Sequence, residues 1–359
     1  MSSFTFQDTI PVREGEEVNI ERLEEFLRKT IDDFPDEPLQ MNQFPSGHSN
    51  LTYEVKAGDW EGVLRRPPLG PVAPKAHDME REYQVLKALH PSFPLAPRPY
   101  VFSDDHGIIG SPFFVMERRR GVVIDTDLPE SLKSTPEAGK MLSSVMVKTL
   151  AELHSLDYKD TPLMQMTKPD GFMQRQVQGW IKRYERAKTH EVPGENELKK
   201  QLVEKIPETK EASVIHYDFK FNNAMFDAAD PSKIIGLFDW EMATVGDPLA
   251  DLGVTLSYWI ESGDPELLQK GFGKPPVTVQ PGFYTRRDVV EQYAKETGRD
   301  VENIDFYLTF AYFKLAVIAQ QIYYRFKKGQ TNDQRFSKFH QTTAALIQHA
   351  DYISRKGIM

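Results

Sequence analysis

The chain has 359 residues and no cysteine, which excludes disulfides, thiolate metal sites and a cysteine nucleophile. Its 40% hydrophobic content is that of a globular protein, and its length favours two lobes over one. Acidic residues outnumber basic ones by 53 to 44, and the net charge of −9 argues against binding nucleic acid through a basic face.

No apolar run reaches the length of about 20 residues that a membrane helix needs. The most apolar segment, 308–324, is interrupted by Lys314 and two glutamines. The first residues also lack the basic and apolar regions of a secretory signal. We therefore expect a cytoplasmic protein that binds neither membranes nor nucleic acid. The sequence does not predict the oligomeric state.

The first third of the chain has a mostly β pattern. Residues 17–34 carry apolar side chains at helical spacing and predict an amphipathic helix. Strands are predicted at 51–55 and 62–65, on either side of a Gly-Asp turn. A helix follows at 76–89, and a further strand is predicted at 113–116.

After Gly121 long helical patterns dominate, and two short apolar strands, 212–215 and 234–238, interrupt them. The predicted helices are 137–156, 172–189, 195–206, 249–261, 286–297, 301–328 and 333–354. This order favours a bilobal α+β fold over an alternating βαβ sheet. We predict a small β-rich lobe at 1–117 and a larger, mainly helical lobe at 118–359.

Polar side chains follow both short strands of the second lobe. The first strand leads into His216-x-Asp218-x-x-x-x-Asn223, and the second into Asp239-Trp240-Glu241. Phosphoryl transfer needs an acceptor for the proton of the attacking hydroxyl and hard oxygen ligands for magnesium, which Asp218, Asn223 and Asp239 supply. The alternative is a polar hairpin whose Asp and Asn cap turns. We disfavour it because an unpaired carboxylate directly after an apolar strand would be costly.

Helical periodicity singles out one inward carboxylate in the first lobe. Met79, Glu82 and Leu86 fall on one face of the predicted helix, whereas Glu80 lies on the polar face. An inward carboxylate requires a cation. We predict that Arg65, on a preceding strand, is the partner of Glu82.

Taken together, these motifs resemble those of the aminoglycoside phosphotransferase and choline kinase-like family, whose fold is similar to that of protein kinases. The motifs that carry the resemblance are 45–53, 63–65, 81–83, 216–223, 239–241 and 246–252. Within the family the chain is most similar to the kinase-like domain fused to some acyl-CoA dehydrogenases. The joint occurrence of these motifs is specific for the family, whereas each motif alone is common.

The resemblance implies roles for the residues of the second lobe. Asp218 is expected to be the catalytic base, or to orient the acceptor hydroxyl, and Asn223 with Asp239 is expected to bind Mg²⁺. His216 is expected to be structural. Asp251 is expected to brace the catalytic loop by hydrogen bonds.

The resemblance also implies an ATP site formed by Gly47, Ser49, Asn50, Arg65, Glu82, Met116 and Glu117. Gly47 and its small polar neighbours form the loop over the phosphates, where glycine permits close backbone approach. Arg65 stands where kinases have a phosphate-binding lysine, and its planar guanidinium differs in geometry from an ammonium. The main chain of Met116 and Glu117 is expected to contact adenine. Neighbouring Arg66 is expected to face solvent.

These expectations describe an ATP- and Mg²⁺-dependent phosphotransferase that acts on a hydroxyl of a small molecule. The acceptor is left open between aminoglycoside-like, choline-like and hydroxyacyl-CoA compounds. Choline requires an aromatic cage, for which the candidates are Trp180, Trp259, Tyr323 and Tyr324. Phosphates of a hydroxyacyl-CoA could meet Lys182, Arg183, Lys314 or Arg325.

Two other classes compete with this hypothesis. The first is a pseudokinase-like nucleotide-binding module, because Arg65 replaces the usual lysine. The second is a metal-dependent hydrolase built on His216, Asp218 and Asp239, which would leave Asn223 without a role. A protein kinase is disfavoured because no A-P-E signature follows Asp239.

Overall fold

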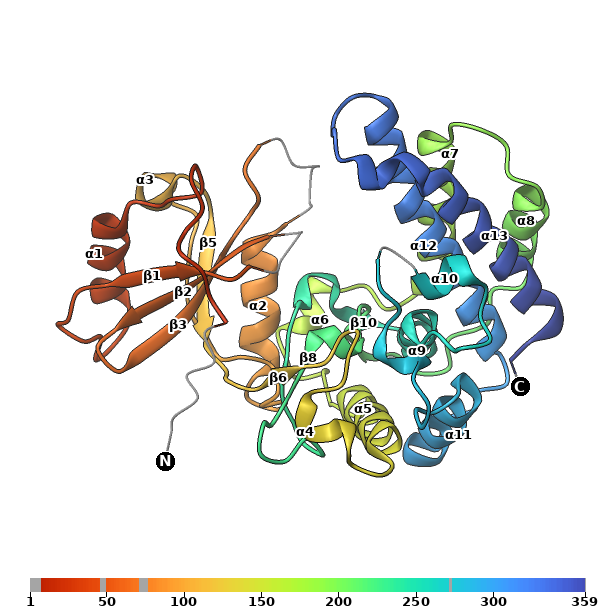
Figure 1. Ribbon diagram of the computed structural model, residues 1–359, viewed down its shortest axis with the longest axis horizontal. Coiled ribbons are helices and arrows are strands. Elements are labelled where there is room, and N and C mark those ends of the chain that lie inside the picture. The colour runs from red at the N-terminus through yellow and green to blue at the C-terminus, as the bar shows by residue number, and fades with distance from the viewer. Residues whose placement is uncertain (1–7, 46–49, 71–76, 271–272, 359) are drawn as a thin grey trace. The chain divides into compact units, whose positions relative to one another are not determined.

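The computed structural model describes residues 8–45, 50–70, 77–270 and 273–358. The chain forms two compact units. The first comprises Met1–Arg120 and Gly236–Glu241, and the second comprises Gly121–Ile235 and Met242–Met359. The first unit is built on an antiparallel sheet and the larger second unit is mainly helical, which confirms the predicted α+β fold class (Figure 1).

The first unit contains a five-stranded sheet with the strand order β1-β2-β3-β5-β4. The strands are β1 (Gln40–Gln43), β2 (Leu51–Ala57), β3 (Trp60–Arg66), β4 (Pro99–Ser103) and β5 (Phe113–Glu117). A tight turn joins β2 to β3, and Gly58 in this turn has φ 54°, a conformation that favours glycine. In the register between β3 and β5, Arg65 lies opposite Phe114.

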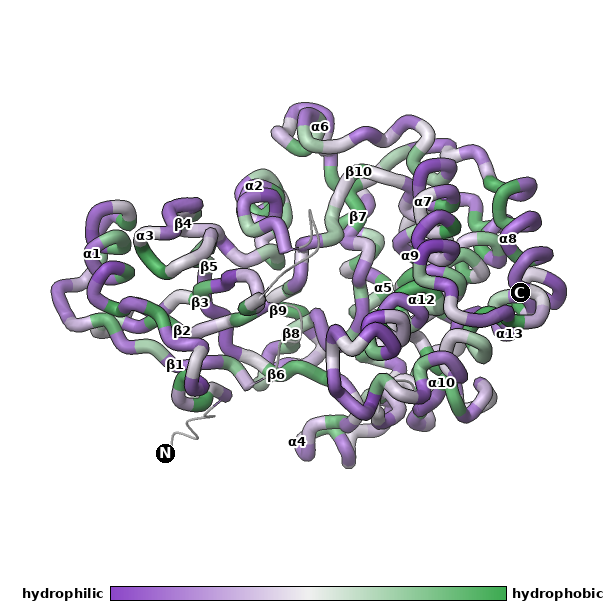
Figure 2. Tube along the Cα trace, turned by 90° about the horizontal axis from the view of Figure 1, so that it is seen from above, coloured by the Kyte–Doolittle hydropathy of each residue, from purple (hydrophilic) through white to green (hydrophobic). Residues whose placement is uncertain are grey.

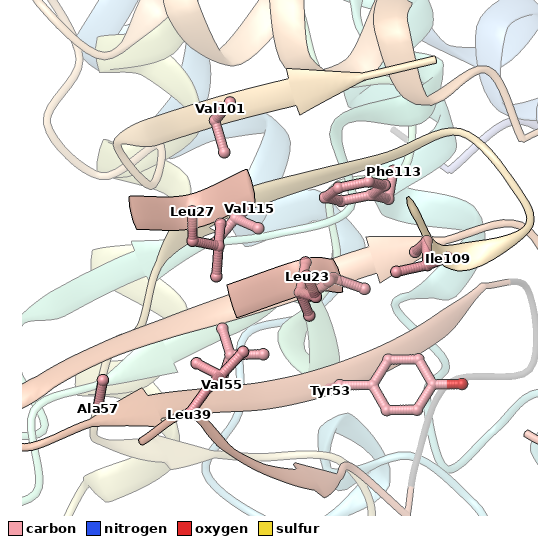
Figure 3. Close-up of a cluster of buried hydrophobic side chains, with 11 residues drawn as sticks. Leu23, Leu27, Leu39, Tyr53, Val55, Ala57, Val101, Ile109, Phe113 and Val115 are labelled. Atoms are coloured by element: carbon pink, nitrogen blue, oxygen red, sulfur yellow. The ribbon is translucent and has the colours of Figure 1, made fainter. Parts of the chain in front are cut away.

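The helices of this unit are α1 (Ile20–Thr30), α2 (Met79–Leu89) and α3 (His106–Ile109). Asn19 caps α1 by accepting a hydrogen bond from Arg22 N. Leu23 and Leu27 of α1 are fully buried and lie among sheet residues such as Val55 (Figure 3). Polar and apolar stretches mix along α1, as expected for a helix with one buried face (Figure 2).

Arg66 corrects one prediction, because it is only 3% exposed and does not face solvent. Its guanidinium donates to Glu16 O at 2.8 Å and to Tyr53 Oη at 3.0 Å. The contacts come from a segment before the sheet and from a neighbouring strand. Strand alternation cannot reveal such coverage, because it describes only the two faces of the sheet.

The second unit is an assembly of helices around two small groups of strands. Its helices are α4 (Glu130–Lys133), α5 (Ala138–His154), α6 (Leu163–Met166), α7 (Phe172–Ala187), α8 (Glu195–Glu204), α9 (Pro248–Tyr258), α10 (Glu266–Lys270), α11 (Arg286–Thr297), α12 (Ile304–Lys327) and α13 (Phe339–Lys356). The long α12 packs against α7, α9 and α13. The pairing of α12 with α13 is visible in Figure 1.

Gly253 determines how closely α9 approaches α12. A Cβ atom at this position would lie 2.7 Å from the backbone carbonyl carbon of Tyr307. Only glycine therefore fits without moving one of the two helices. This close contact fixes the position of α12 relative to the residues of α9.

The strands of this part are β6 (Val122–Val123), β7 (Ser213–Ile215), β8 (Ala224–Phe226), β9 (Ile234–Leu237) and β10 (Thr244–Gly246). The last two residues of β9 belong to the first unit. Strand β7 pairs with β10, and β6, β8 and β9 form a small sheet. The two short apolar strands predicted at 212–215 and 234–238 are therefore confirmed. Among the described residues, no helix combines the length and the apolar character needed to cross a bilayer.

Candidate active site

The catalytic loop predicted from the sequence follows β7 and ends in the 3₁₀ turn Phe221–Asn223. Asn223 Nδ2 donates to Asp218 Oδ2 at 3.0 Å and to the Asp218 carbonyl at 2.9 Å. Lys220 Nζ lies 3.0 Å from the same Oδ2. Within the part of the chain that the structure describes, Asp218 Oδ1 and Asn223 Oδ1 accept no hydrogen bond. These two oxygens are therefore free to meet a hydroxyl and a cation.

Asp251 of α9 braces this loop, which confirms the prediction. It accepts hydrogen bonds from His216 N at 2.6 Å and from Tyr217 N at 2.9 Å. His154 Nε2 lies 3.1 Å from the same carboxylate. Burial alone would raise the pKa of Asp251, but the hydrogen bonds and the nearby imidazoles hold it below its ordinary value. The loop is thus held by a buried, ionised side chain.

The predicted ion pair of the first unit is confirmed. Arg65 Nη1 lies 2.9 Å from Glu82 Oε1, and Arg65 Nη2 lies 3.3 Å from Asp239 Oδ1. Burial raises the pKa of Glu82 to about 7, an effect that Arg65 opposes and that Asp239 and Glu241 reinforce. Burial lowers the pKa of Arg65, but the two carboxylates outweigh it, so the guanidinium stays charged.

Asp239 reaches this cluster because residues 236–241 pack in the first unit. Leu237 N donates to Leu95 O at 2.8 Å, and the buried Trp240 ring lies 6.0 Å from Phe93. Asp239 itself has φ 67°, a left-handed conformation that Asp tolerates better than most side chains. The carboxylate is therefore presented by a short, anchored turn.

Asn50 belongs to the same cluster of the first unit. Its Nδ2 lies 3.4 Å from Glu241 Oε2, and its Oδ1 lies 2.8 Å from His77 Nδ1. Burial and the Arg65 charge lower the pKa of His77. The predicted phosphate-loop residues Gly47 and Ser49 lie outside the described residues.

Met116 and Glu117 end the sheet strand β5. Met116 is buried, and the Glu117 N–H donates to Arg98 O at 2.8 Å. The Glu117 carboxylate accepts from Arg98 N at 3.0 Å and pairs with Arg119 at 2.8 Å. A contact between adenine and the Glu117 N–H would have to replace an existing hydrogen bond.

Each aromatic ring considered for a choline cage already contacts a group of the protein. The cations of Arg183 and Lys314 lie 4.6 and 5.7 Å from the Trp180 ring, Lys327 lies 6.0 Å from Tyr323, and Lys328 lies 5.6 Å from Tyr324. The Trp259 indole is buried and donates to Tyr284 O at 2.7 Å. These contacts leave less ring surface for a quaternary ammonium.

The side chains predicted to bind magnesium carry oxygens of the kind that this ion takes in proteins. Mg²⁺ usually takes few protein ligands and completes its shell with phosphate and water oxygens. Asn223 in the second unit and Asp239 in the first carry suitable oxygens. A hydrolase centre on His216 fits poorly, because this side chain is fully buried. No group of three or more His, Asp or Glu side chains among the described residues is arranged to hold a metal.

Three residues near the predicted ones received no role from the sequence. Glu241 and Lys220 lie two residues after Asp239 and Asp218, so their proximity was a usable signal. His77 lies in a segment without a motif, and no sequence signal indicates its contact with Asn50.

Comparisons with known proteins place the chain among phosphotransferases. A protein from Ralstonia eutropha, named as a candidate aminoglycoside phosphotransferase, is similar over 94% of this chain and 99% of its own, with 26% identity and a TM-score of 0.77. A choline kinase from Cryptosporidium parvum shares the fold, with a TM-score of 0.64 and 13% identity over 94% of this chain and 96% of its own. The fold is that of the small-molecule kinases.

The phosphotransferase enzyme family matches residues 40–273. The chain belongs to this family and is a small-molecule kinase by class. Mouse acyl-CoA dehydrogenase family member 10 is 31% identical over 98% of this chain, which spans 32% of that protein. The chicken family member 11 is 31% identical over 93% of this chain, which spans 43% of that protein. The chain thus spans less than half the length of these relatives.

Proposed function

We propose that the protein transfers the γ-phosphoryl group of ATP to a hydroxyl of a small molecule, with Mg²⁺ as the metal. The observation that carries this proposal is the pairing of Asn223 Nδ2 with Asp218. This pairing leaves one carboxylate oxygen for a hydroxyl proton and the amide oxygen for a cation. Bound Mg²⁺ would neutralise charge on the phosphates.

In this mechanism the acceptor hydroxyl donates a hydrogen bond to Asp218. Its oxygen forms a bond to the γ-phosphorus while the bond from that phosphorus to the β,γ-bridging oxygen breaks. The hydroxyl proton passes to the Asp218 carboxylate, and ADP and a phosphate monoester leave. Lys220, 3.0 Å from Asp218 Oδ2, orients the carboxylate through this ion pair.

Support for the donor comes from the first unit and from the family. The Arg65–Glu82 pair presents a charged guanidinium suited to phosphate oxygens. A related structure, a spectinomycin phosphotransferase with a TM-score of 0.55 and 13% identity, is a complex with ADP. We therefore take ATP as the donor.

We infer that the acceptor is an anionic hydroxyl compound of the hydroxyacyl-CoA class. Two observations favour it over choline. Lys220 lies beside Asp218, and Lys182 and Arg183 are exposed on α7. Cations of the protein lie over three of the four aromatic rings considered for a quaternary ammonium, namely Trp180, Tyr323 and Tyr324. The curated relatives are also acyl-CoA dehydrogenases by name.

An acceptor screen tests the proposal. Purified protein with MgATP is incubated with hydroxybutyryl-CoA, choline, kanamycin or no acceptor, and ADP and the phosphorylated product are measured by mass spectrometry. We expect product with hydroxybutyryl-CoA. ADP formation that no acceptor increases, in a protein that MgATP stabilises thermally, would instead support the second candidate.

The second candidate is a nucleotide-binding module of pseudokinase type. The observation that favours it is Arg65 in place of lysine, bonded to both Glu82 and Asp239. An arginine held by two carboxylates has less freedom to follow a moving phosphoryl group than a lysine. Thermal stabilisation by MgATP without product from any acceptor is the expected result for this function.

A further inference from the structure

Lys314 is a buried cation next to the catalytic loop. It lies in α12, is 5% exposed and belongs to the second unit, as the loop does. Its Nζ donates to the Tyr217 carbonyl at 3.3 Å and lies 3.7 Å from the centre of the Tyr217 ring. Burying an ammonium costs free energy unless partners compensate for lost water. At 5% exposure Lys314 is placed to act on the loop rather than to bind a phosphate of the acceptor.

The carbonyl that Lys314 contacts belongs to a strained residue. Tyr217 has φ 64°, a left-handed conformation that is unfavourable for a residue other than glycine. Its N–H donates to Asp251 at 2.9 Å. Asp251 therefore holds the N–H of Tyr217, and Lys314 holds its carbonyl. The next residue in the chain is Asp218.

Helices α9 and α12 supply these two groups from a rigid contact. Asp251 lies two residues before Gly253, where a Cβ would come within 2.7 Å of the Tyr307 backbone. Lys314 lies seven residues after Tyr307, which places both on one face of α12. The close packing of α9 against α12 thus fixes the backbone positions from which these two side chains extend.

We propose that Lys314 is a positioning residue of the phosphotransferase site, which holds the left-handed Tyr217 peptide and thereby orients the Asp218 carboxylate toward the acceptor hydroxyl. This inference rests on the proposed function. Removing Lys314 leaves the Tyr217 carbonyl without this donor and lets the peptide relax toward ordinary φ values. The carboxylate of Asp218 then turns with it.

The charge of Lys314 should make the activity depend on pH. Burial lowers the pKa of Lys314 to about 8, with Lys220 and Arg183 acting in the same direction and Asp218 and Asp251 opposing them. Lys314 is thus charged below about pH 8 and neutral above it. A neutral amine is a weaker donor and has no cation–π attraction to Tyr217. Activity should therefore fall as pH rises through this value.

The test compares Lys314→Met with Lys327→Met. Lys327 is the matched control, because it is an exposed lysine of α12 that also lies over a tyrosine ring, 6.0 Å from Tyr323. Hydrogen–deuterium exchange of peptides covering 213–224 reads the loop without any activity. We expect exchange at least tenfold faster in Lys314→Met and unchanged exchange in Lys327→Met. Equal exchange in the wild type and Lys314→Met would overturn the proposal.

Kinetics with MgATP and hydroxybutyryl-CoA, or with water as acceptor if that compound is not turned over, give the second readout. Loss of a hydrogen bond from a charged donor predicts a fall in kcat of about 10- to 100-fold, with KM for ATP unchanged. The alkaline fall in activity should disappear. A higher KM for the acceptor with unchanged kcat would contradict a positioning role. So would activity that still falls at alkaline pH in the variant.

Lys314→Gln keeps a donor without charge and carries the test if the Met variant does not fold. We expect it to recover part of kcat and to lack the alkaline fall; a variant with wild-type pH dependence would overturn the inference. Absence of phosphoryl transfer in the wild type would refute the proposed function instead. In that case the exchange measurement alone still decides whether Lys314 holds the loop.

Discussion

The Asp218→Asn variant removes the proposed proton acceptor while keeping most of its contacts. The new side chain retains an oxygen that can accept from Asn223 Nδ2, which now lies 3.0 Å from Asp218 Oδ2. What is lost is the negative charge and the basicity of the carboxylate. General base catalysis contributes about 10²- to 10⁴-fold, so the barrier should rise by about 3–5 kcal/mol.

The effect on folding should be much smaller. The Asp218–Lys220 pair is partly exposed, with side-chain exposures of 17% and 25%, and such a pair contributes up to about 1 kcal/mol. The Tm should therefore change by about 2–4 °C at most. Asp300→Asn is the matched control, since it breaks an exposed Asp–Lys pair with Lys210 at 2.7 Å.

The assay measures ADP release with MgATP and acceptor, together with the thermal shift caused by MgATP. We expect Asp218→Asn to lose turnover and to keep the thermal shift, and Asp300→Asn to keep both. Equal turnover in the wild type and Asp218→Asn would remove Asp218 from the mechanism. Loss of the thermal shift as well would mean that the residue acts in binding.

Four further predictions concern the ion pair and the brace. Arg65→Met should abolish the MgATP-induced thermal shift, because the variant lacks the cation for phosphate; an undiminished shift would exclude Arg65 from the nucleotide site. Asp251→Asn should lower the free energy of unfolding by about 1.5–3 kcal/mol in urea titrations, because the hydrogen bonds from His216 and Tyr217 lose a charged acceptor. Burial raises the pKa of Glu82 from 4.5 to about 7, so Glu82 loses its charge as pH falls through 7. The kcat/KM of the wild type should therefore fall below pH 7. The kcat/KM of Glu82→Gln, which has no charge to lose, should not fall there. Because the pKa of Glu82 is raised in the folded state, this group stabilises the fold fully below pH 4.5, and the stabilisation is lost as pH rises to about 7. Urea titrations at several pH values measure this change in the free energy of unfolding.

Local patterns were sufficient for the long helices, for the strands next to the site motifs and for the fold class, but not for several short strands and helices such as β1, β8 and α4. Helical periodicity predicted α11 with the bounds that the structure has, where Thr285 and Asp288 form a capping box and Gly298 ends the helix. It also put Glu82 on the inner face of α2, where the structure pairs it with Arg65. Such signals survive in sequence because they depend on neighbours three or four residues apart.

Motif spacing identified the candidate catalytic residues, but only one of the residues that hold their loop in place. The spacing from Asp218 to Asn223 is local, so the loop that joins them could be predicted. Asp251 was expected to be the brace through the resemblance, and in the structure it accepts hydrogen bonds from the loop. Lys314 had no local signal, because its relation to Tyr217 depends on the packing of α12.

The amino-acid sequence by itself thus determined the long helices, the strands that lead into the site motifs, and which polar groups follow those strands. Only the tertiary structure decided that residues 236–241 pack in the first unit, that Arg66 is buried, and that a lysine of α12 reaches the Tyr217 carbonyl. The physical reason is the distance along the chain over which each kind of interaction acts. Periodicity and capping act over one or two turns of chain, whereas burial and ion pairing depend on side chains that are distant in sequence and meet only when the core has packed.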